Sequence, residues 1–499
     1  MLIKSKFYPL NVVFISNYID YFLDSSNLFD FEKYFLCGFA SSIKNIGNNV
    51  TLILPYHKGI DLNKIFSKKD LIKSDTVIIS FDREGRDERE VKFNVFTCNG
   101  IQVVFIEDSL ISERDGFLFD PSNGIFYPDN PKRFSIFAKS SLEALKVLPL
   151  KPDIIHVVGE WVSISAIYCK LLYKYDNFFK GTRVIFTVPS LNNQILFPPD
   201  QYSSLGIDWK YFSYEYLEFY GKVNILKGGI VFSDLVTFCS ESYIEEAKKE
   251  EFGNGLEGLI KKGIAENKIR AVIPGVDSSY DPSKDYYLAK IKANYSKDNI
   301  TGKAKVKRYI CDKAKINPNT MVFLFFDKLV ESTGISLVYE VFYDLLPKNN
   351  ISIIIIGKGD TFREDSIREL ISQYPGKVTW FSEVSKDEII YYIAGSDVIL
   401  IPSISESSTI KHIVSMKYGT LPLVRGVGIL NDVVRDKING FKFYDYLPSV
   451  FKEKVEESIE FYFKNPKRWY KFVDTAMKSE FSWNNTAKKY DEIYRELKK

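Results

Sequence analysis

The sequence predicts an α/β protein made of two doubly wound, Rossmann-like domains. Short apolar runs rich in β-branched and aromatic residues alternate with amphipathic helical patterns, which is typical of parallel sheets covered by helices. This alternation runs through the first half of the chain and restarts near residue 320. A chain of 499 residues is long enough for each half to bury its own core. We therefore expect a ligand cleft between two domains, at the carboxyl ends of their strands.

Twelve apolar runs are predicted to be strands. Those of the first half are Asn11–Ser16, Asn49–Leu54, Gln102–Glu107, Asp153–Val158, Arg183–Val188, Leu235–Ser240 and Arg270–Asp277. Those of the second half are Thr320–Phe326, Ile351–Gly357, Lys377–Phe381, Asp397–Ser403 and Leu421–Arg425. The polar, lysine-rich stretch between them, Asp281–Asn299, is predicted to connect the two halves.

Composition narrows the class of protein. The formal net charge is only +3, so charge gives no argument for nucleic acid or a membrane surface as a partner. Five cysteines without metal-type spacing favour a reduced, cytoplasmic chain. The apolar run Leu10–Ile15 is too short to cross a bilayer and is predicted to be a core strand. The histidines show no metal-ligand spacing, so we expect no metal and no cofactor.

The most informative segment is Glu218–Leu259. It contains an apolar helical pattern at Val223–Phe232 and a buried-strand pattern at Leu235–Ser240. Ser240 and Ser242 are candidate N-caps for a helix over Tyr243–Lys249. Strand, serine-rich turn and helix follow one another as in nucleotide-handling α/β domains.

This segment resembles the bacterial glycogen synthases and plant starch synthases, whose corresponding segment carries FYGK and LKGGI before a strand that ends in serine. Further matches occur in family order at Tyr127–Leu145 and Thr301–Lys307, and at GKGD, PGKV, AGSDVILIPS and MKYGTLPLVR. The resemblance implies the GT-B architecture. Residues 1–285 would form the acceptor-side domain, 286–465 the nucleotide-sugar domain, and 466–499 a C-terminal helix that packs back on the first domain.

The resemblance also implies a reaction: transfer of glucose from ADP-glucose or UDP-glucose to an α-1,4-glucan, with retention of configuration. Several of the positions that it marks as catalytic or phosphate-binding are altered. The lysine and glycine loop that meets the donor diphosphate corresponds to Leu28–Phe31. The catalytic histidine corresponds to Val162, and two further polar positions correspond to Pro189 and Pro274.

Other positions keep usable chemistry. The resemblance assigns Glu406 to the donor sugar, and a helix starting at Ser407, Ser408 and Thr409 would offer N–H groups to a phosphate. The alternative for Glu406 is an ordinary acid at a helix N-terminus. The two cations that bind the diphosphate in the family correspond to Lys328, which retains a charge, and Thr333, which does not.

On the acceptor side, Asp129, Arg133 and Gln194 match the family, with Asp129 as a second catalytic candidate. A surface i,i+4 pair explains Asp129 and Arg133 equally well. His156 ends an apolar strand and is predicted to be a packed core histidine. Lys303, Lys305 and Lys307 are predicted to form a solvated face.

Two functions follow. One is a glycogen or starch synthase-like glucosyltransferase with reduced or lost activity, since the loss of several cleft cations weakens transition-state stabilisation. The other is a catalytically inactive relative that binds a glucan, a nucleotide or another protein. The sequence gives no oligomeric state.

Overall fold

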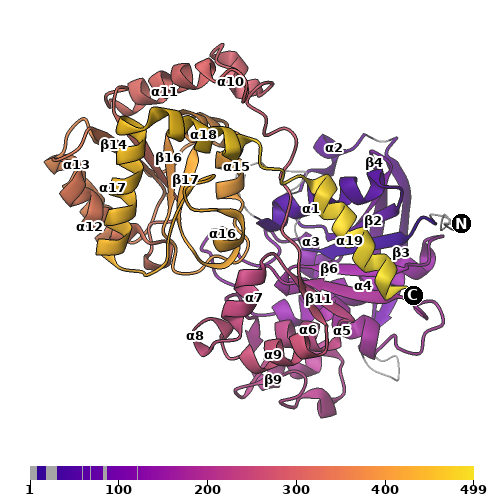
Figure 1. Cartoon of the computed structure of the whole chain (residues 1–499). Helices are drawn as coiled ribbons and strands as arrows, with labels where there is room; N and C mark the ends of the chain where they lie inside the picture. The colour runs from indigo at the N-terminus through magenta and orange to yellow at the C-terminus, as the bar shows by residue number, and fades with distance from the viewer. Residues whose placement is uncertain (1–7, 18–30, 59, 68, 82–86, 121) are drawn as a thin grey trace, which may run out of the picture.

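The computed structural model describes residues 8–17, 31–58, 60–67, 69–81, 87–120 and 122–499. They form two α/β domains, and the C-terminal helix returns to the first (Figure 1). The two domains were predicted from the restart of the apolar pattern, and both are confirmed.

The first domain contains a nine-stranded sheet in the order β12-β11-β7-β6-β1-β2-β5-β4-β3. Its strands are β1 (Asn11–Ser16), β2 (Asn49–Pro55), β3 (Leu71–Ser80), β4 (Glu88–Cys98), β5 (Ile101–Glu107), β6 (Ile154–Val158), β7 (Arg183–Thr187), β11 (Leu235–Phe238) and β12 (Ile269–Ala271). Its helices are α1 (Phe31–Asn45), α2 (Leu62–Ile65), α3 (Ser109–Ser112), α4 (Asn130–Val147), α5 (Ile164–Leu171), α6 (Ile225–Phe232), α7 (Glu241–Ala247), α8 (Glu250–Gly253) and α9 (Glu257–Ala265).

Two parts of this sheet differ from the prediction. β3 and β4 form an antiparallel hairpin at the sheet edge, and the sequence pattern did not predict it. β3 alternates exposed and partly buried residues, so it lacks the continuous apolar run of the parallel strands. The predicted strand Arg270–Asp277 ends at Ala271. Val272 N still donates to the Phe238 carbonyl at 2.8 Å, and Pro274 has no N–H with which to continue the parallel ladder.

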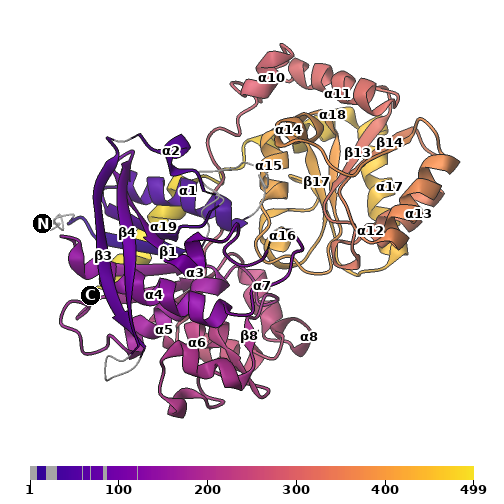
Figure 2. The ribbon, with the colours of Figure 1, turned by 180° about the vertical axis from the view of Figure 1, so that it is seen from behind.

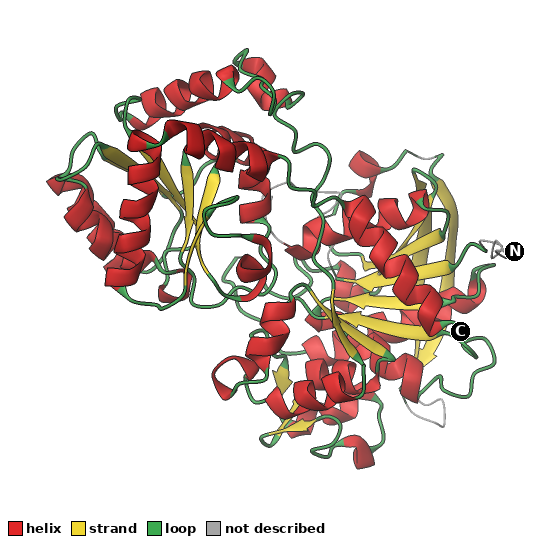
Figure 3. Ribbon diagram, viewed as in Figure 1, coloured by secondary structure: helices red, strands yellow, loops and turns green. Residues whose placement is uncertain are grey.

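The second domain contains six parallel strands in the order β15-β14-β13-β16-β17-β18, with helices on both faces (Figure 3). The strands are β13 (Met321–Phe326), β14 (Ile351–Ile356), β15 (Val378–Phe381), β16 (Val398–Ile401), β17 (Leu421–Arg425) and β18 (Phe441–Phe443). The helices are α10 (Tyr286–Lys290), α11 (Thr301–Ala314), α12 (Ile335–Leu345), α13 (Thr361–Gln373), α14 (Lys386–Gly395), α15 (Lys411–Lys417), α16 (Gly428–Val433), α17 (Pro448–Lys464) and α18 (Pro466–Met477).

This strand order is that of the dinucleotide-binding Rossmann fold. The order reverses between β13 and β16, so the loops that follow these two strands diverge and leave a crevice. The residues after β13 begin with Asp327, and those after β16 lead to Glu406. The fold therefore predicts a ligand site where these two loops meet.

The segment 466–499 contains two helices that pack on different domains. α18 packs against α15, α17 and β17 of the second domain, whereas α19 (Trp483–Leu497) packs against α1 of the first (Figure 1). The crossover is thus made by α19. Tyr494 of α19 bonds to His156 Nδ1 at 2.7 Å, and His156 Nε2 bonds to Thr187 Oγ1 at 2.6 Å. Burial lowers the pKa of His156 to about 3, as a neutral core histidine requires.

The segment 218–259 is mainly scaffold. The predicted helix from Val223 begins at Ile225, because Asn224 accepts a hydrogen bond from Lys227 N and caps it. A Cβ on Gly228 would lie 2.7 Å from an Ile167 methyl, and one on Gly229 would lie 2.9 Å from the Phe186 ring. These glycines let α6 approach its neighbours closely, which explains the LKGGI string without any ligand.

Two of the lysines predicted to form a solvated face instead bind groups inside the second domain. Lys303 donates to the carbonyls of Ala394 and Ser396, both at 2.8 Å, and desolvation lowers its pKa to about 7. Lys307 pairs with Asp397 at 2.6 Å. Lys305 is exposed as predicted. The prediction was wrong for Lys303 and Lys307 because they lie on the face of α11 that packs on α14.

Candidate active site at the domain junction

A cavity of about 490 Å³ lies where the carboxyl ends of β13 and β16 face the first domain. Its described lining is Asn192, Glu251 and Phe252 from the first domain, and Asp327, Ser332, Thr333, Ile404, Ser405, Glu406, Ser408, Thr409 and Lys411 from the second. Both domains therefore contribute to it, and its position is the one that the strand order predicts.

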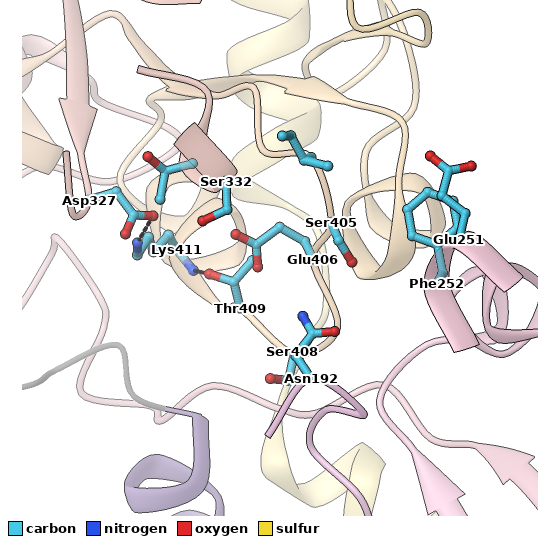
Figure 4. Close-up of a pocket in the computed structure, with 12 residues that line it drawn as sticks. Asn192, Glu251, Phe252, Asp327, Ser332, Ser405, Glu406, Ser408, Thr409 and Lys411 are labelled. Carbon is cyan, nitrogen blue, oxygen red and sulfur yellow. Dashed lines mark hydrogen bonds and ion pairs between the residues drawn. The ribbon is translucent and has the colours of Figure 1, made fainter. Parts of the chain in front are cut away.

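Glu406 is the central titratable group of the cavity (Figure 4). Ser403 Oγ donates to Glu406 Oε1 at 3.0 Å, and the Glu406 carbonyl accepts from Ile429 N at 3.0 Å. Desolvation raises the pKa of Glu406 to about 7, with Lys411 lowering it and Asp327 raising it. A carboxyl group with this pKa can either donate to or accept from a sugar hydroxyl at neutral pH.

Lys411 supplies a positive charge that the sequence did not predict. It is the first residue of α15, its ammonium group forms an ion pair with Asp327, and it lies 5.5 Å from the centroid of the Phe326 ring. Among the described residues that line the cavity, it is the one lysine or arginine. The signal available in the sequence was a lysine five residues after Glu406, where the helix that follows β16 begins.

The predicted helix start at Ser407, Ser408 and Thr409 is wrong. These residues form an irregular loop, and α15 begins at Lys411. Serine and threonine side chains compete with the helix for backbone hydrogen bonds, and Thr409 Oγ1 here accepts from Lys411 N at 3.4 Å (Figure 4). Ser408 and Thr409 line the cavity, whereas Ser407 is not among its lining residues.

The family's two phosphate-binding cations correspond to Lys328 and Thr333, and only Thr333 lines the cavity. Thr333 lines the cavity, and its hydroxyl donates to the carbonyls of Lys328 and Val330 at 2.8 and 2.7 Å. Lys328 is exposed and is not among the residues that line the cavity. The cation beside Glu406 is therefore Lys411.

Asp129 and Arg133 are bonded within the first domain. Arg114 binds both oxygens of Asp129, each at 2.8 Å. Arg133 is fully buried, and its guanidinium donates to the carbonyls of Leu110 and Phe117 at 2.8 and 2.5 Å. Arg133 N donates to the Asp129 carbonyl at 3.1 Å, as in a helix turn, but the Asp129 carboxylate pairs with Arg114, so the two residues are not the surface pair considered above. Neither residue is among those that line the cavity.

Gln194 lies next to the cavity rim. Its side chain donates to the Asn254 carbonyl at 2.7 Å and accepts from Asn224 Nδ2 at 2.6 Å. Asn254 in turn donates to the side chain of Asn192, which lines the cavity, at 2.8 Å. Gln194 thus positions a rim residue through Asn254.

The altered positions of the first domain hold apolar side chains. Val162 is 1% exposed, in the short 3-10 segment Glu160–Val162. The catalytic histidine that the resemblance implies there is thus replaced by a core side chain. The family's phosphate loop corresponds to Leu28–Phe31, of which residues 28–30 lie outside the described residues and Phe31 begins α1.

Two Rossmann-like domains with a cavity at the switch point of the second are the GT-B architecture. The catalytic domain of starch synthase IV from Arabidopsis thaliana, solved with ADP and acarbose, superposes with a TM-score of 0.82 at 23% identity, covering 98% of this chain and 100% of that one. Sucrose-phosphate synthase from Thermosynechococcus elongatus superposes with a TM-score of 0.60 at 14% identity, covering 98% and 99%. These likenesses establish the fold.

Sequence comparison identifies the family. Residues 36–262 match the starch synthase catalytic domain, and residues 307–473 match the glycosyl transferases group 1. The glycogen synthase of Thermodesulfovibrio yellowstonii is 32% identical over 480 residues, covering 90% of this chain and 91% of that one. That of Petrotoga mobilis is 31% identical, covering 91% and 92%. The chain belongs to the glycogen synthase family. No helix of the described part of the chain is long and apolar enough to span a bilayer.

Proposed function

We propose that the chain transfers glucose from a nucleoside diphosphate glucose to an α-glucan in the cavity around Glu406, with reduced activity. The observation that carries this proposal is Lys411. It places a cation beside Glu406 at the switch point, although the two phosphate-binding positions implied by resemblance have become an exposed lysine and a threonine.

The chemistry requires a positive charge at this place. As the bond from glucose C1 to the diphosphate breaks, negative charge grows on the leaving phosphate, and a fixed cation stabilises it most where water is excluded. The hydroxyls of Ser408 and Thr409, on the same loop as Glu406, and the Lys411 ammonium, at the start of α15, lie on the second-domain wall. This arrangement fits a diphosphate next to the donor sugar.

The ion pair between Lys411 and Asp327 explains why we expect reduced activity. A diphosphate that approaches Lys411 also approaches the Asp327 carboxylate, so attraction to one charge is offset by repulsion from the other. Lys411 must turn from Asp327 towards the phosphate before its full charge acts there. A site with one shared cation stabilises the leaving group less than one with two dedicated cations.

The first-domain wall is the acceptor side in this proposal. Asn192 offers an amide and Phe252 a partly buried ring, and both face the second domain across the cavity. An amide and an aromatic ring are a common pairing for the hydroxyls and the apolar face of a glucose unit.

The second candidate function is a non-catalytic module that binds a glucan, a nucleotide or a protein. The fully buried Val162 favours it, because this side chain can neither orient a sugar nor exchange a proton. This candidate shares the cavity and the Lys411 contact with the first but lacks turnover.

Incorporation of radiolabelled glucose from ADP-glucose and UDP-glucose into glycogen distinguishes the two. The purified protein is compared with Glu406→Ala and with Glu383→Ala, a control at an exposed glutamate that pairs with Lys358. Incorporation that is lost in Glu406→Ala and retained in Glu383→Ala supports the transferase. Calorimetric binding of ADP, UDP or a maltooligosaccharide without incorporation supports the module, and the absence of both contradicts both.

A further inference from the structure

Two short helices, one from each domain, are joined by hydrogen bonds to side-chain carboxylates. α7 of the first domain packs against α16 of the second at the domain junction, as Figures 1 and 2 both show. Asp432 of α16 accepts from Ser240 Oγ at 2.7 Å and from Ser242 N at 3.3 Å, at the start of α7. Glu246 of α7 accepts from Gly428 N at 2.9 Å, at the start of α16.

Gly428 also contacts the loop that carries Glu406. The amide of the next residue, Ile429, donates to the Glu406 carbonyl at 3.0 Å. Gly428 has φ +46°, and a Cβ added there would lie 1.7 Å from the same carbonyl oxygen. The backbone of Glu406 therefore rests directly on Gly428, and only glycine fits this contact. A chain of contacts runs from Glu246 through Gly428 to Glu406.

The surroundings of Glu246 indicate a specific fit rather than a surface contact. Glu246 is half-buried, and its second oxygen makes no hydrogen bond within the described part of the chain. Desolvation raises its pKa and Asp432 adds to the rise, whereas the Gly428 amide, Arg425 and Lys249 oppose it. An acceptor held in this environment is stabilised chiefly by the Gly428 amide, so its place depends on the apposition of the two domains.

We propose that Glu246 is a positioning residue: it holds Gly428 when the domains are apposed and thereby sets the backbone of Glu406 in the cavity. The first domain thus controls the geometry of a residue that belongs entirely to the second. The consequence for transfer rests on the proposed function, whereas the coupling itself does not. Domain opening removes the Glu246 acceptor and leaves the Gly428 amide and the Glu406 loop without this support.

The test is amide hydrogen exchange of the full chain without ligand, followed by mass spectrometry. Glu246→Ala removes the acceptor, Glu246→Gln keeps an acceptor oxygen in the same shape, and Glu245→Ala is a matched control on the same helix that pairs with Lys248 instead. We expect peptides that cover 426–431 and 403–407 to exchange about tenfold faster in Glu246→Ala. Glu246→Gln and Glu245→Ala should match the parent.

The proposal is overturned if Glu246→Ala exchanges like Glu245→Ala, or if only 426–431 is affected and 403–407 is not. It is also overturned if Glu246→Gln behaves like Glu246→Ala, because a shape-matched acceptor should restore the contact. Equal melting temperatures of the variants exclude general unfolding. Where transfer is measurable, kcat should fall about tenfold in Glu246→Ala with rescue by Glu246→Gln. If the parent shows no transfer, the proposed function fails while the exchange result still decides this coupling.

Discussion

Two charged pairs of residues differ in the hydrogen bonds and ion pairs that they make. Glu406 and Lys411 belong to the second-domain wall of the cavity, whereas Asp129 and Arg133 were predicted as substrate contacts in the first domain. Arg133 and Asp129 are bonded to carbonyls and to Arg114 within the first domain. Glu406 takes one side-chain hydrogen bond, from Ser403, and Lys411 shares its charge with Asp327 inside the cavity. The difference teaches that Asp129 and Arg133 are structural, whereas Glu406 and Lys411 lie in the cavity with fewer partners of their own.

The largest effect that tests this difference is on stability. We expect Arg133→Leu to lower the free energy of unfolding by roughly 3 kcal/mol, because it leaves several buried carbonyl oxygens without a donor. The measurement is chemical denaturation beside Lys132→Leu, a substitution at the preceding position of α4. Folded Arg133→Leu should bind ADP and maltooligosaccharide like the parent. A selective loss of maltooligosaccharide binding at unchanged stability would assign Arg133 to the substrate and break the comparison.

The sequence predicts those features that depend on local composition. β14 was predicted because it is a continuous apolar run, buried along its whole length. The parallel strand β18 was not predicted, because its three residues include Lys442 and make no continuous apolar run. The hairpin of β3 and β4 was missed because its residues alternate and one face is exposed. Resemblance supplied Glu406. Resemblance also assigned Arg133 to a substrate, and spacing along α4 could not correct this, because the partners of Arg133 lie in the separate segment Leu110–Phe117.

Lys411 was missed for a related reason. Its role depends on where α15 begins, and helix ends are the least predictable part of a sequence pattern. The prediction placed the helix at Ser407, four residues early, so the cation fell inside the helix rather than at its start. The strand order of the second sheet, which only the structure gives, places its loop beside that of Asp327.

The next effect is on nucleotide affinity. We expect Lys411→Met to weaken ADP binding about tenfold, because it removes the cation of the cavity and leaves Asp327 to repel the diphosphate. Calorimetry compares it with Lys417→Met, at the other end of α15, and with Lys328→Met, the cation assigned by resemblance. The loss of affinity should be confined to Lys411→Met. A larger loss in Lys328→Met would return the phosphate contact to the exposed lysine.

A smaller effect concerns pH. The pKa of Glu406 is raised to about 7 from its ordinary value of 4.5, so the folded state favours the protonated carboxyl. Its contribution to stability is complete below pH 4.5 and is lost as the pH rises through 7. We expect the parent to lose ~1 kcal/mol more than Glu406→Gln between pH 5 and pH 8, after allowance for solvent screening. Urea unfolding of both proteins at the two pH values measures this difference in the free energy of unfolding. If the free energy changes equally with pH in both proteins, the pKa of Glu406 is not raised and its carboxyl group is not desolvated.

The smallest effect acts in the opposite direction from the others. Asp327 raises the pKa of Glu406 and pairs with Lys411, so it works against an anionic ligand through both partners. We expect Asp327→Asn to tighten ADP binding about threefold, because the amide keeps an acceptor for Lys411 but removes the negative charge. The same variant should shift the Glu406 titration to lower pH. Calorimetry at two salt concentrations checks the electrostatic origin, since the gain should shrink at high salt. A weaker affinity of Asp327→Asn for ADP would show instead that the carboxylate is needed to hold Lys411 in place. The pair of Asp327 and Lys411 would then be structural, like that of Asp129 and Arg114.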